Sequence, residues 1–174
     1  YPEAVDTFLS FFCDYQKTTN EFFVKNALPS GLKGFEEVVT YDPSLEVNGD
    51  FSAASGYNVV QAMLRTGVSF DGIFAANDQM AVGAIRALCN AKIPIPEKVK
   101  IVGFDNTFIS SIVNPSLTTI NVPIYKMGMA AATQLLERLE RTGNNAVSIR
   151  MDYELIIRRS TMASAQTNWD MVYW

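Results

Sequence analysis

Polar and aromatic residues lie at the carboxyl ends of three predicted strands, and they are the residues of this chain best suited to hold a ligand. They occur as the pairs Asp50-Phe51, Asn77-Asp78 and Asp105-Asn106. Carboxylate and amide groups form hydrogen bonds with hydroxyl groups, and an aromatic ring covers the apolar face of a sugar or a base. Ligands of open α/β sheets lie beyond the carboxyl ends of the strands. The three pairs therefore predict a crevice for a polyhydroxylated small molecule.

Each of these residues also has a purely structural alternative. Asp78 stands where an aspartate often caps the helix that follows it. Asp105 follows a strand directly, where its only role can be to form a turn. Phe51 can belong to the hydrophobic core. These alternatives stay open at the level of sequence.

Enzyme chemistry finds little support in the sequence. The chain has no histidine, which removes Ser-His-Asp triads and most imidazole metal sites. It has neither a GxGxxG pattern after a strand nor a GxxxxGK[ST] phosphate loop. The carboxylates could form an acid–base pair, hold Mg²⁺ or offer Asp105 for phosphorylation, but no accompanying acidic pair or lysine supports these roles. We expect no enzyme, no cofactor and no metal site.

Composition and charge narrow the class of protein further. Of the 174 residues 48% are hydrophobic and 18% are charged, which is typical of a globular domain. The net charge of −4 argues against a basic surface that grips nucleic acid. No apolar run approaches the about 18 residues of a membrane-spanning helix, and the first residues lack the basic segment of a signal peptide. We expect a cytoplasmic protein with no membrane partner.

Cys13 and Cys89 form no CxxC pair. Nothing in the sequence requires a disulfide between them, although one is compatible with it. We expect two separate, buried thiols.

Hydrophobic patterns divide the chain into three parts. Residues 1–44 are hard to interpret and partly helical, residues 45–161 form an α/β lobe with a crossover helix at 124–141, and residues 162–174 form a tail. Within the lobe, the patterns predict strands at 45–51, 71–76, 99–104 and 117–122, helices at 53–65 and 79–91, an irregular loop at 106–115, and a strand or hairpin at 147–157. Strands alternating with helices in this way indicate a parallel sheet with right-handed connections.

Caps and apolar faces support the predicted helices. Ser52 is suited to cap the first helix, Gly67 ends it, and Asn77-Asp78 begins the second. A Gly143-Asn-Asn segment is suited to end the helix that starts at residue 124. The apolar faces comprise Tyr57, Val60, Met63 and Leu64; then Met80, Ala84, Ile85 and Leu88; and finally Met127, Ala131, Leu135 and Leu139.

Several ordered motifs resemble the LacI/GalR family of transcriptional regulators. They are FDGIFAANDQMAVGA at 70–84, IPEKVKIVGFDN at 95–106, NPSLTTI at 114–120, LIIRRST at 155–161 and GDFSAASGY at 49–57. The resemblance covers roughly residues 32–161. It implies a three-layer αβα fold, a parallel-sheet, Rossmann-like lobe of a type I periplasmic-binding-protein-like domain.

The resemblance also implies a function. In that family the effector domain closes on a sugar or nucleobase and passes its state to an N-terminal helix-turn-helix, without catalysis. Matched motif by motif, Phe51 would stack on the ligand, while Asn77 and Asp105 would hold its polar groups. Asp78 would lie beside them, both capping and lining the site. A homodimer is implied, with DNA bound only through a headpiece outside this chain.

Two departures from the family pattern keep other interpretations open. Gly31 occupies the position of an arginine that usually lies three residues before the pair Gly34-Phe35, and most of the first lobe is missing. The stripe on the helix at 124–139 then needs another cover, either the N-terminal segment or a second chain. The alternatives are a LacI-like sensor domain of a kinase or diguanylate cyclase, a transporter's sugar-binding protein, and a degenerate or stand-alone module.

Overall fold

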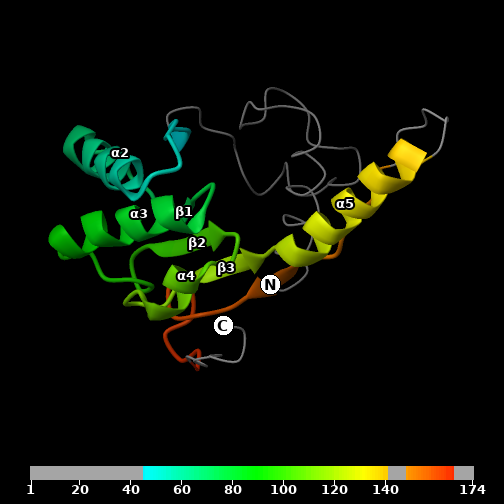
Figure 1. Ribbon diagram of the computed structural model, residues 1–174. Helices are drawn as coiled ribbons and strands as arrows, with labels where there is room; N and C mark the ends of the chain where they lie inside the picture. Colours follow the sequence, from blue (N-terminus) through cyan, green and yellow to red (C-terminus); the bar gives the residue numbers. More distant parts are fainter. Residues whose placement is uncertain (1–44, 141–147, 167–174) are drawn as a thin grey trace, which may run out of the picture. The chain divides into compact units, whose positions relative to one another are not determined.

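The computed structural model describes residues 45–140 and 148–166 (Figure 1). The chain divides into two units between Glu46 and Val47, and everything described below concerns the second unit, apart from the first two residues. The predictions for residues 1–44, including Gly31 and Cys13, lie outside the described residues. So do the predicted helix end at Gly143 and the last part of the tail.

One four-stranded sheet organises the described lobe (Figure 1). The strands are β1 (Gly72–Phe74), β2 (Lys100–Phe104), β3 (Thr118–Asn121) and β4 (Glu154–Ile156), and they lie in that order. β1, β2 and β3 are parallel, whereas β4 runs antiparallel to β3. The predicted α/β fold with a parallel sheet is confirmed, and the carboxyl ends of β1 to β3 face the same edge.

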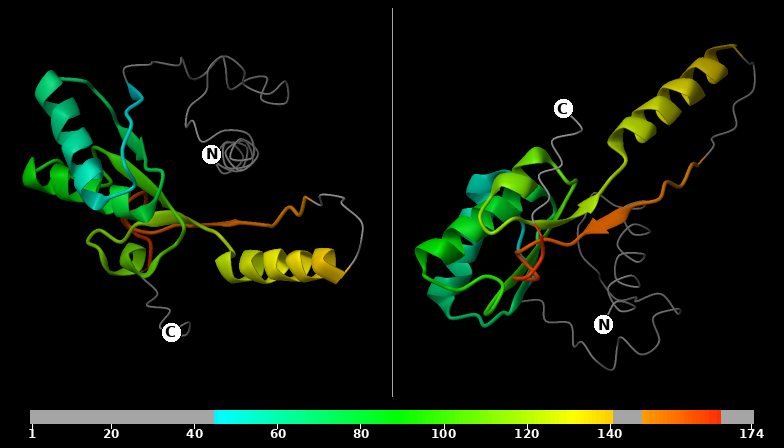
Figure 2. Two further views of the ribbon diagram at one scale, coloured as in Figure 1. Left: turned by 45° about the horizontal axis from the view of Figure 1, so that its top comes forward. Right: turned by 90° about the horizontal axis from the view of Figure 1, so that it is seen from below.

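Two helices precede the strands β1 and β2 and lie side by side (Figure 2). They are α2 (Ala53–Thr66) and α3 (Asp78–Asn90), within one residue of the predicted ranges. Ser52 caps α2, since its hydroxyl oxygen accepts a hydrogen bond of 3.1 Å from the Ser55 amide. Gly67 ends α2 with a φ of 73°, a left-handed conformation that suits glycine.

The first predicted strand, 45–51, is wrong. The described segment before α2 forms no strand, because local side chains bond its backbone instead. The Asp50 carboxylate accepts a hydrogen bond of 2.9 Å from the Ser52 amide, and the Asp50 amide donates to the Ser55 hydroxyl at 3.2 Å. Such side-chain bonds favour a turn over a sheet ladder.

Three further expectations need correction. The loop at 106–115 contains the short helix α4 (Phe108–Ile112). At its carboxyl end, the Val113 amide donates a hydrogen bond to the Ile109 carbonyl. In the segment 147–157 only β4 is a strand, limited to the three residues that pair with β3. Cys89 is free, as expected, but it is exposed rather than buried and lies in the last turn of α3.

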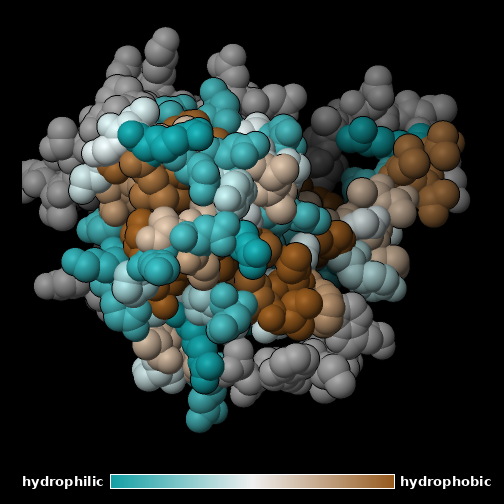
Figure 3. Space-filling view, turned by 90° about the vertical axis from the view of Figure 1, so that its left-hand side faces the viewer, coloured by the Kyte–Doolittle hydropathy of each residue, from teal (hydrophilic) through white to brown (hydrophobic). Residues whose placement is uncertain are grey.

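The long helix α5 (Ile124–Glu140) confirms the predicted helix, but its apolar stripe is exposed. Met127 is 46% exposed, Leu135 60% and Leu139 75%. Apolar side chains also reach the surface elsewhere, as the brown areas of Figure 3 show. Among the described residues, no helix has the length and apolar character needed to cross a membrane.

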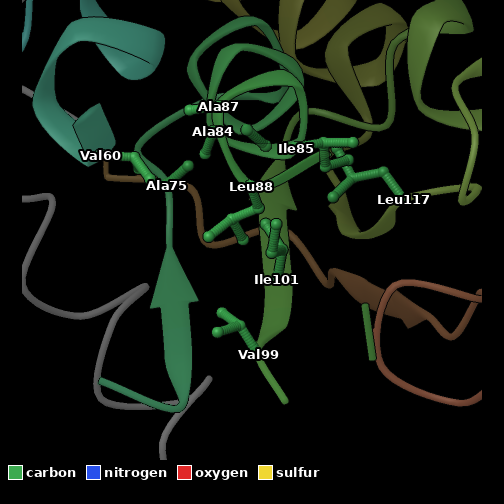
Figure 4. Close-up of a cluster of buried hydrophobic side chains, with 10 residues drawn as sticks. Val60, Ala75, Ala84, Ile85, Ala87, Leu88, Val99, Ile101 and Leu117 are labelled. Atoms are coloured by element: carbon green, nitrogen blue, oxygen red, sulfur yellow. The ribbon is translucent and has the colours of Figure 1, made fainter. Parts of the chain in front are cut away.

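A buried cluster joins α2 and α3 to the sheet (Figure 4). Val60 comes from α2, Ile85 and Leu88 from α3, Ile101 from β2, and Leu117 from the residue before β3. Each is at most 3% exposed. Burying a side chain of this size stabilises the fold by about 1.5–3 kcal/mol. The predicted apolar face of α3 therefore packs against the sheet, whereas α2 packs chiefly against α3 and contributes Val60 to the cluster.

Two glycines allow α2 and α3 to approach closely. A Cβ added at Gly83 would collide with the backbone carbonyl oxygen of Ala53, and one added at Gly56 would collide with the carbonyl oxygen of Met80. Backbone atoms cannot turn aside as the end of a side chain can. The contact between the two helices therefore requires glycine at both positions.

Gly83→Ala is expected to lower the free energy of unfolding by about 1–3 kcal/mol, because the added methyl group forces the two helices apart. Gly128→Ala is the matched control, since a Cβ there meets nothing within 4 Å. In the interior of α5 it is expected to raise the free energy of unfolding by about 1 kcal/mol. Urea denaturation measures both, and a neutral or stabilising Gly83→Ala would contradict the packing described here.

Candidate ligand-binding site

Phe51 and Asn77, which lie far apart in the sequence, are joined directly. The Asn77 side-chain amide donates a hydrogen bond of 3.0 Å to the backbone carbonyl of Phe51. Phe51 has a φ of 65°, which is uncommon for a residue other than glycine, and it is 59% exposed. Its ring therefore does not belong to the core, and the predicted neighbourhood of the aromatic and amide residues is present.

The turn that presents Phe51 is held by its acidic neighbour. Hydrogen bonds from the Ser52 side chain and backbone, and from Ser55, lower the pKa of Asp50 to about 2. The Asp50 carboxylate is therefore ionised at all ordinary pH values. Its described contacts are within the turn, so it acts as a support for Phe51.

Asn77 has two structural roles. Its Oδ1 accepts a hydrogen bond of 2.8 Å from the Met80 amide, which makes it the N-cap of α3. Its Nδ2 holds the Phe51 carbonyl, as described above. A primary amide has two N–H groups, so a second donor remains for a ligand beside the described contacts. The expectation that Asn77 belongs to the site is compatible with these bonds.

Asp78 lies beneath the strand ends, fully buried. The expectation that it caps its own helix is wrong, because Asn77 does so. Instead, its Oδ2 accepts hydrogen bonds from the amide and the hydroxyl of Thr107 at 2.6 and 2.9 Å. Its Oδ1 accepts from the Thr119 hydroxyl at 2.6 Å. A direct ligand contact for Asp78 stays a prediction, and its complete burial argues against one.

The Asp78 carboxylate needs a glycine opposite it. A Cβ added at Gly103, in the middle of β2, would collide with Oδ1 of Asp78 and lie 2.8 Å from Cδ2 of Leu117. Burial raises the pKa of Asp78, while the hydrogen bonds from Thr119 and Thr107 act in the opposite direction.

Asp105 follows β2 and turns the chain sharply. Its φ is 103°, and its amide donates a hydrogen bond of 3.0 Å to the carbonyl of Ile120 in β3. Its side chain is half-buried. Burial, and then the nearby charge of Asp78, raise the pKa of Asp105 above the ordinary value of 3.8. A carboxylate with a raised pKa at the end of a strand is a common mark of a functional site.

Sequence reasoning missed the residues that support this turn. Arg158 donates a hydrogen bond of 2.8 Å from Nη2 to Oδ1 of Asn106. Thr107 and Thr119 donate the hydrogen bonds that the Asp78 carboxylate accepts. No local pattern marks these side chains, because they come from separate elements that only the folded sheet brings together. In the sequence, Arg158 and Arg159 stood out only as part of the LIIRRST motif at 155–161.

The arrangement can hold a ligand through an exposed ring, an amide donor and a partly buried carboxylate. Within residues 45–140 and 148–166, no three His, Cys, Asp or Glu side chains are grouped so that they could hold a metal ion. The polar groups fit a neutral molecule with several hydroxyl or ring-nitrogen groups.

Comparison with known proteins gives the same family for most of the chain. The model of the periplasmic binding protein-like domain matches residues 31–161. Two curated relatives are the HTH-type transcriptional regulator RegA of Clostridium saccharobutylicum and the HTH-type transcriptional repressor PurR of Pasteurella multocida. RegA is 34% identical over 142 residues, and PurR is 33% identical over 144 residues.

These relatives are longer proteins. The RegA match covers 79% of this chain and 43% of RegA, and the PurR match covers 83% of this chain and 41% of PurR. The chain thus spans about two fifths of the length of the curated relatives that it matches.

A solved structure supports the same fold. The transcriptional regulator CelR, in complex with cellobiose, superimposes with a TM-score of 0.68 at 30% sequence identity, covering 74% of this chain and 41% of CelR. The parallel sheet, the sequence motifs at its strand ends and these similarities all indicate the same fold family. The chain belongs to the periplasmic binding protein-like domain family, and the relatives named here that it matches are transcriptional regulators.

Proposed function

We propose that this chain is the sensing lobe of a LacI/GalR-type regulator, which binds a sugar or a nucleobase and performs no catalysis. The observation that carries the proposal is the hydrogen bond between Asn77 and exposed Phe51 in a domain of this family. Half-buried Asp105 follows the parallel strand β2 at the same edge of the sheet, which supports its assignment to the same site. Phe51 covers an apolar face of the ligand, Asn77 donates to it, and Asp105 accepts from its hydroxyl or N–H groups.

The partly buried position of Asp105 suits recognition of a neutral ligand. A carboxylate that has already lost part of its hydration gives up less when a ligand covers it, and its fixed turn keeps it aimed in one direction. Hydrogen bonds to an ionised carboxylate are also stronger than those between neutral groups. Asp105 is therefore the residue on which we expect affinity to depend most.

The sensing mechanism that we propose is a shift of population. A ligand that binds a closed cleft better than an open one favours the closed state by the ratio of its two affinities. An attached helix-turn-helix domain would read that state, and the regulator would act as a homodimer in the cytoplasm. The net charge of −4 fits a lobe that leaves the contact with DNA to another domain.

The similarity to a regulator bound to cellobiose supports a sugar as the first class of effector to test. A nucleobase is the second class, because it offers the same combination of an apolar face and polar edges. Failure of every member of both classes to bind would instead favour a degenerate module that has lost its ligand.

Asp105→Ala is expected to abolish the thermal stabilisation that a true ligand gives the wild-type chain, while the variant still unfolds cooperatively. A ligand present at 100 times its Kd stabilises the native state by about 2.7 kcal/mol, so the loss is measurable in a thermal-shift assay. The probes are cellobiose, ribose and purine bases.

Asp71→Ala is the matched control, because Asp71 is an exposed aspartate at the opposite end of β1. It is expected to respond to the ligand as the wild type does. An Asp105→Ala chain that is stabilised normally would show that the site lies elsewhere.

Acid is expected to change affinity and stability in opposite directions. The pKa of Asp105 is raised in the folded chain, so protonation begins at a pH where an ordinary aspartate is still ionised. Affinity for the ligand should fall as the pH drops through this raised pKa, because the protonated carboxyl accepts hydrogen bonds poorly. The folded state binds the proton more tightly than the unfolded state, so this group contributes more to the free energy of unfolding as the pH falls.

Calorimetric titration with a ligand and urea denaturation, each over a series of pH values, measure the two trends. Asp105→Asn carries no titrating group at this position and should lack both of them. A wild-type affinity that is constant down to the pH at which free aspartate titrates would contradict the role given to Asp105.

A further inference from the structure

Two consecutive residues at the proposed site have backbone conformations that side chains rarely adopt. The φ angles are 103° at Asp105 and 52° at Asn106. Neither residue is glycine, so each conformation is disfavoured by contacts between its own Cβ and the backbone. Surrounding structure must therefore hold this turn in place.

The side chain and backbone of Asn106 receive that support from four hydrogen bonds. The longest, of 3.4 Å, is donated by the Ser110 hydroxyl to Oδ1 of Asn106, and the other three are shorter. Oδ1 of Asn106 also accepts a hydrogen bond of 2.8 Å from Nη2 of Arg158. Its Nδ2 donates to Oδ1 of Asn121 at 3.2 Å, and its backbone amide donates to the hydroxyl of Thr119 at 3.3 Å. The bond from Arg158 is the shortest of the four and the one that carries a charge, which makes such bonds stronger.

Arg158 is itself rigidly anchored. Its Nη1 donates hydrogen bonds of 2.9 Å to the Ser110 hydroxyl and to the Leu117 carbonyl. Its backbone amide donates to the Thr118 hydroxyl at 2.8 Å. The planar guanidinium therefore joins the segment after β4 to α4, to the residue before β3 and to the turn after β2. A lysine has a single nitrogen and does not reproduce this fork.

We propose that Arg158 is a positioning residue, which holds the turn at Asp105-Asn106 in its left-handed conformation through Oδ1 of Asn106 and so aims the Asp105 carboxylate. The part of this inference that concerns ligand affinity rests on the function proposed above. The part that concerns the backbone of the turn does not require any ligand.

The backbone test uses the full chain without ligand. Arg158→Met keeps much of the length of the side chain but removes its hydrogen bonds. Nuclear magnetic resonance couplings and chemical shifts report φ at Asp105 and Asn106. We expect the positive φ at Asn106 to be lost or averaged in this variant. Retention of both positive φ angles would overturn the proposal.

Arg159→Met is the matched control, because it changes the neighbouring, exposed arginine, whose Nε approaches the Ala165 carbonyl at 3.5 Å. It is expected to leave both φ angles as they are. If Arg159→Met disturbs the turn as much as Arg158→Met, a general loss of positive charge explains the effect and the proposal is wrong.

Glycine at position 106 separates the role of the turn from the role of the side chain. Asn106→Gly adopts a positive φ freely, whereas Asn106→Ala does not and has no Oδ1. We expect Arg158→Met to change φ in the turn much less in the Asn106→Gly background than in the wild type. The effects of the two substitutions should therefore not be additive. If Arg158→Met does not fold, Asn106→Ala and Asn106→Gly are compared alone, and equal conformations of their turns would overturn the proposal.

The affinity test uses cellobiose, or whichever probe of the panel stabilises the wild type. Arg158→Met is expected to weaken binding about tenfold or more, since the competent turn becomes a minor state. Arg159→Met should bind as the wild type does. If no probe binds the wild-type chain, the proposed ligand class is wrong, and the backbone test still decides the role of Arg158. Unchanged affinity in Arg158→Met would contradict its role in aiming Asp105.

Discussion

The buried carboxylate of Asp78 is the interaction on which the geometry of the strand ends depends. It joins the first turn of α3 to Thr107 beyond β2 and to Thr119 in β3, through three hydrogen bonds. An unpaired carboxylate in this position would be costly, so the donors on both sides must keep their places. Gly103 leaves the space that the carboxylate fills. The support of the site is therefore a buried carboxylate whose hydrogen bonds come from two threonines on separate segments.

The sequence predicted most of the fold because the strongest signals are local. The helices α2 and α3 carry clear caps and apolar faces, and the strands β1 and β2 are short apolar runs that follow them. The prediction failed at 45–51, where alternating residues suggested a strand but Asp50 and Ser55 bond the backbone into a turn. It also failed at α4, which is too short to show a helical period.

The candidate site was predicted in part, for a similar reason. Parallel strands end at one edge, so Asn77 and Asp105 were expected near each other, and Phe51 was expected with them. The role of Asp78 was predicted wrongly, because an aspartate at the start of a helix gives the same sequence pattern whether it caps the helix or is buried against other strands. Arg158 was missed, since its partner Asn106 lies far away along the chain and no local pattern connects the two residues. Only the folded sheet brings such residues together.

The bonds of Asn77 also determine the polarity of recognition at that position. Its Oδ1 is bound to an amide of α3 and one N–H is bound to the carbonyl of Phe51, so the side-chain amide cannot exchange its two ends. The second N–H group of Asn77 remains as a hydrogen-bond donor, directed within the plane of the amide group. A ligand bound at Asn77 in the way proposed above would have to present a lone pair there, from a hydroxyl oxygen or an unprotonated ring nitrogen. Isomers that differ only in the orientation of that single group would be told apart by a residue whose orientation the fold has already decided.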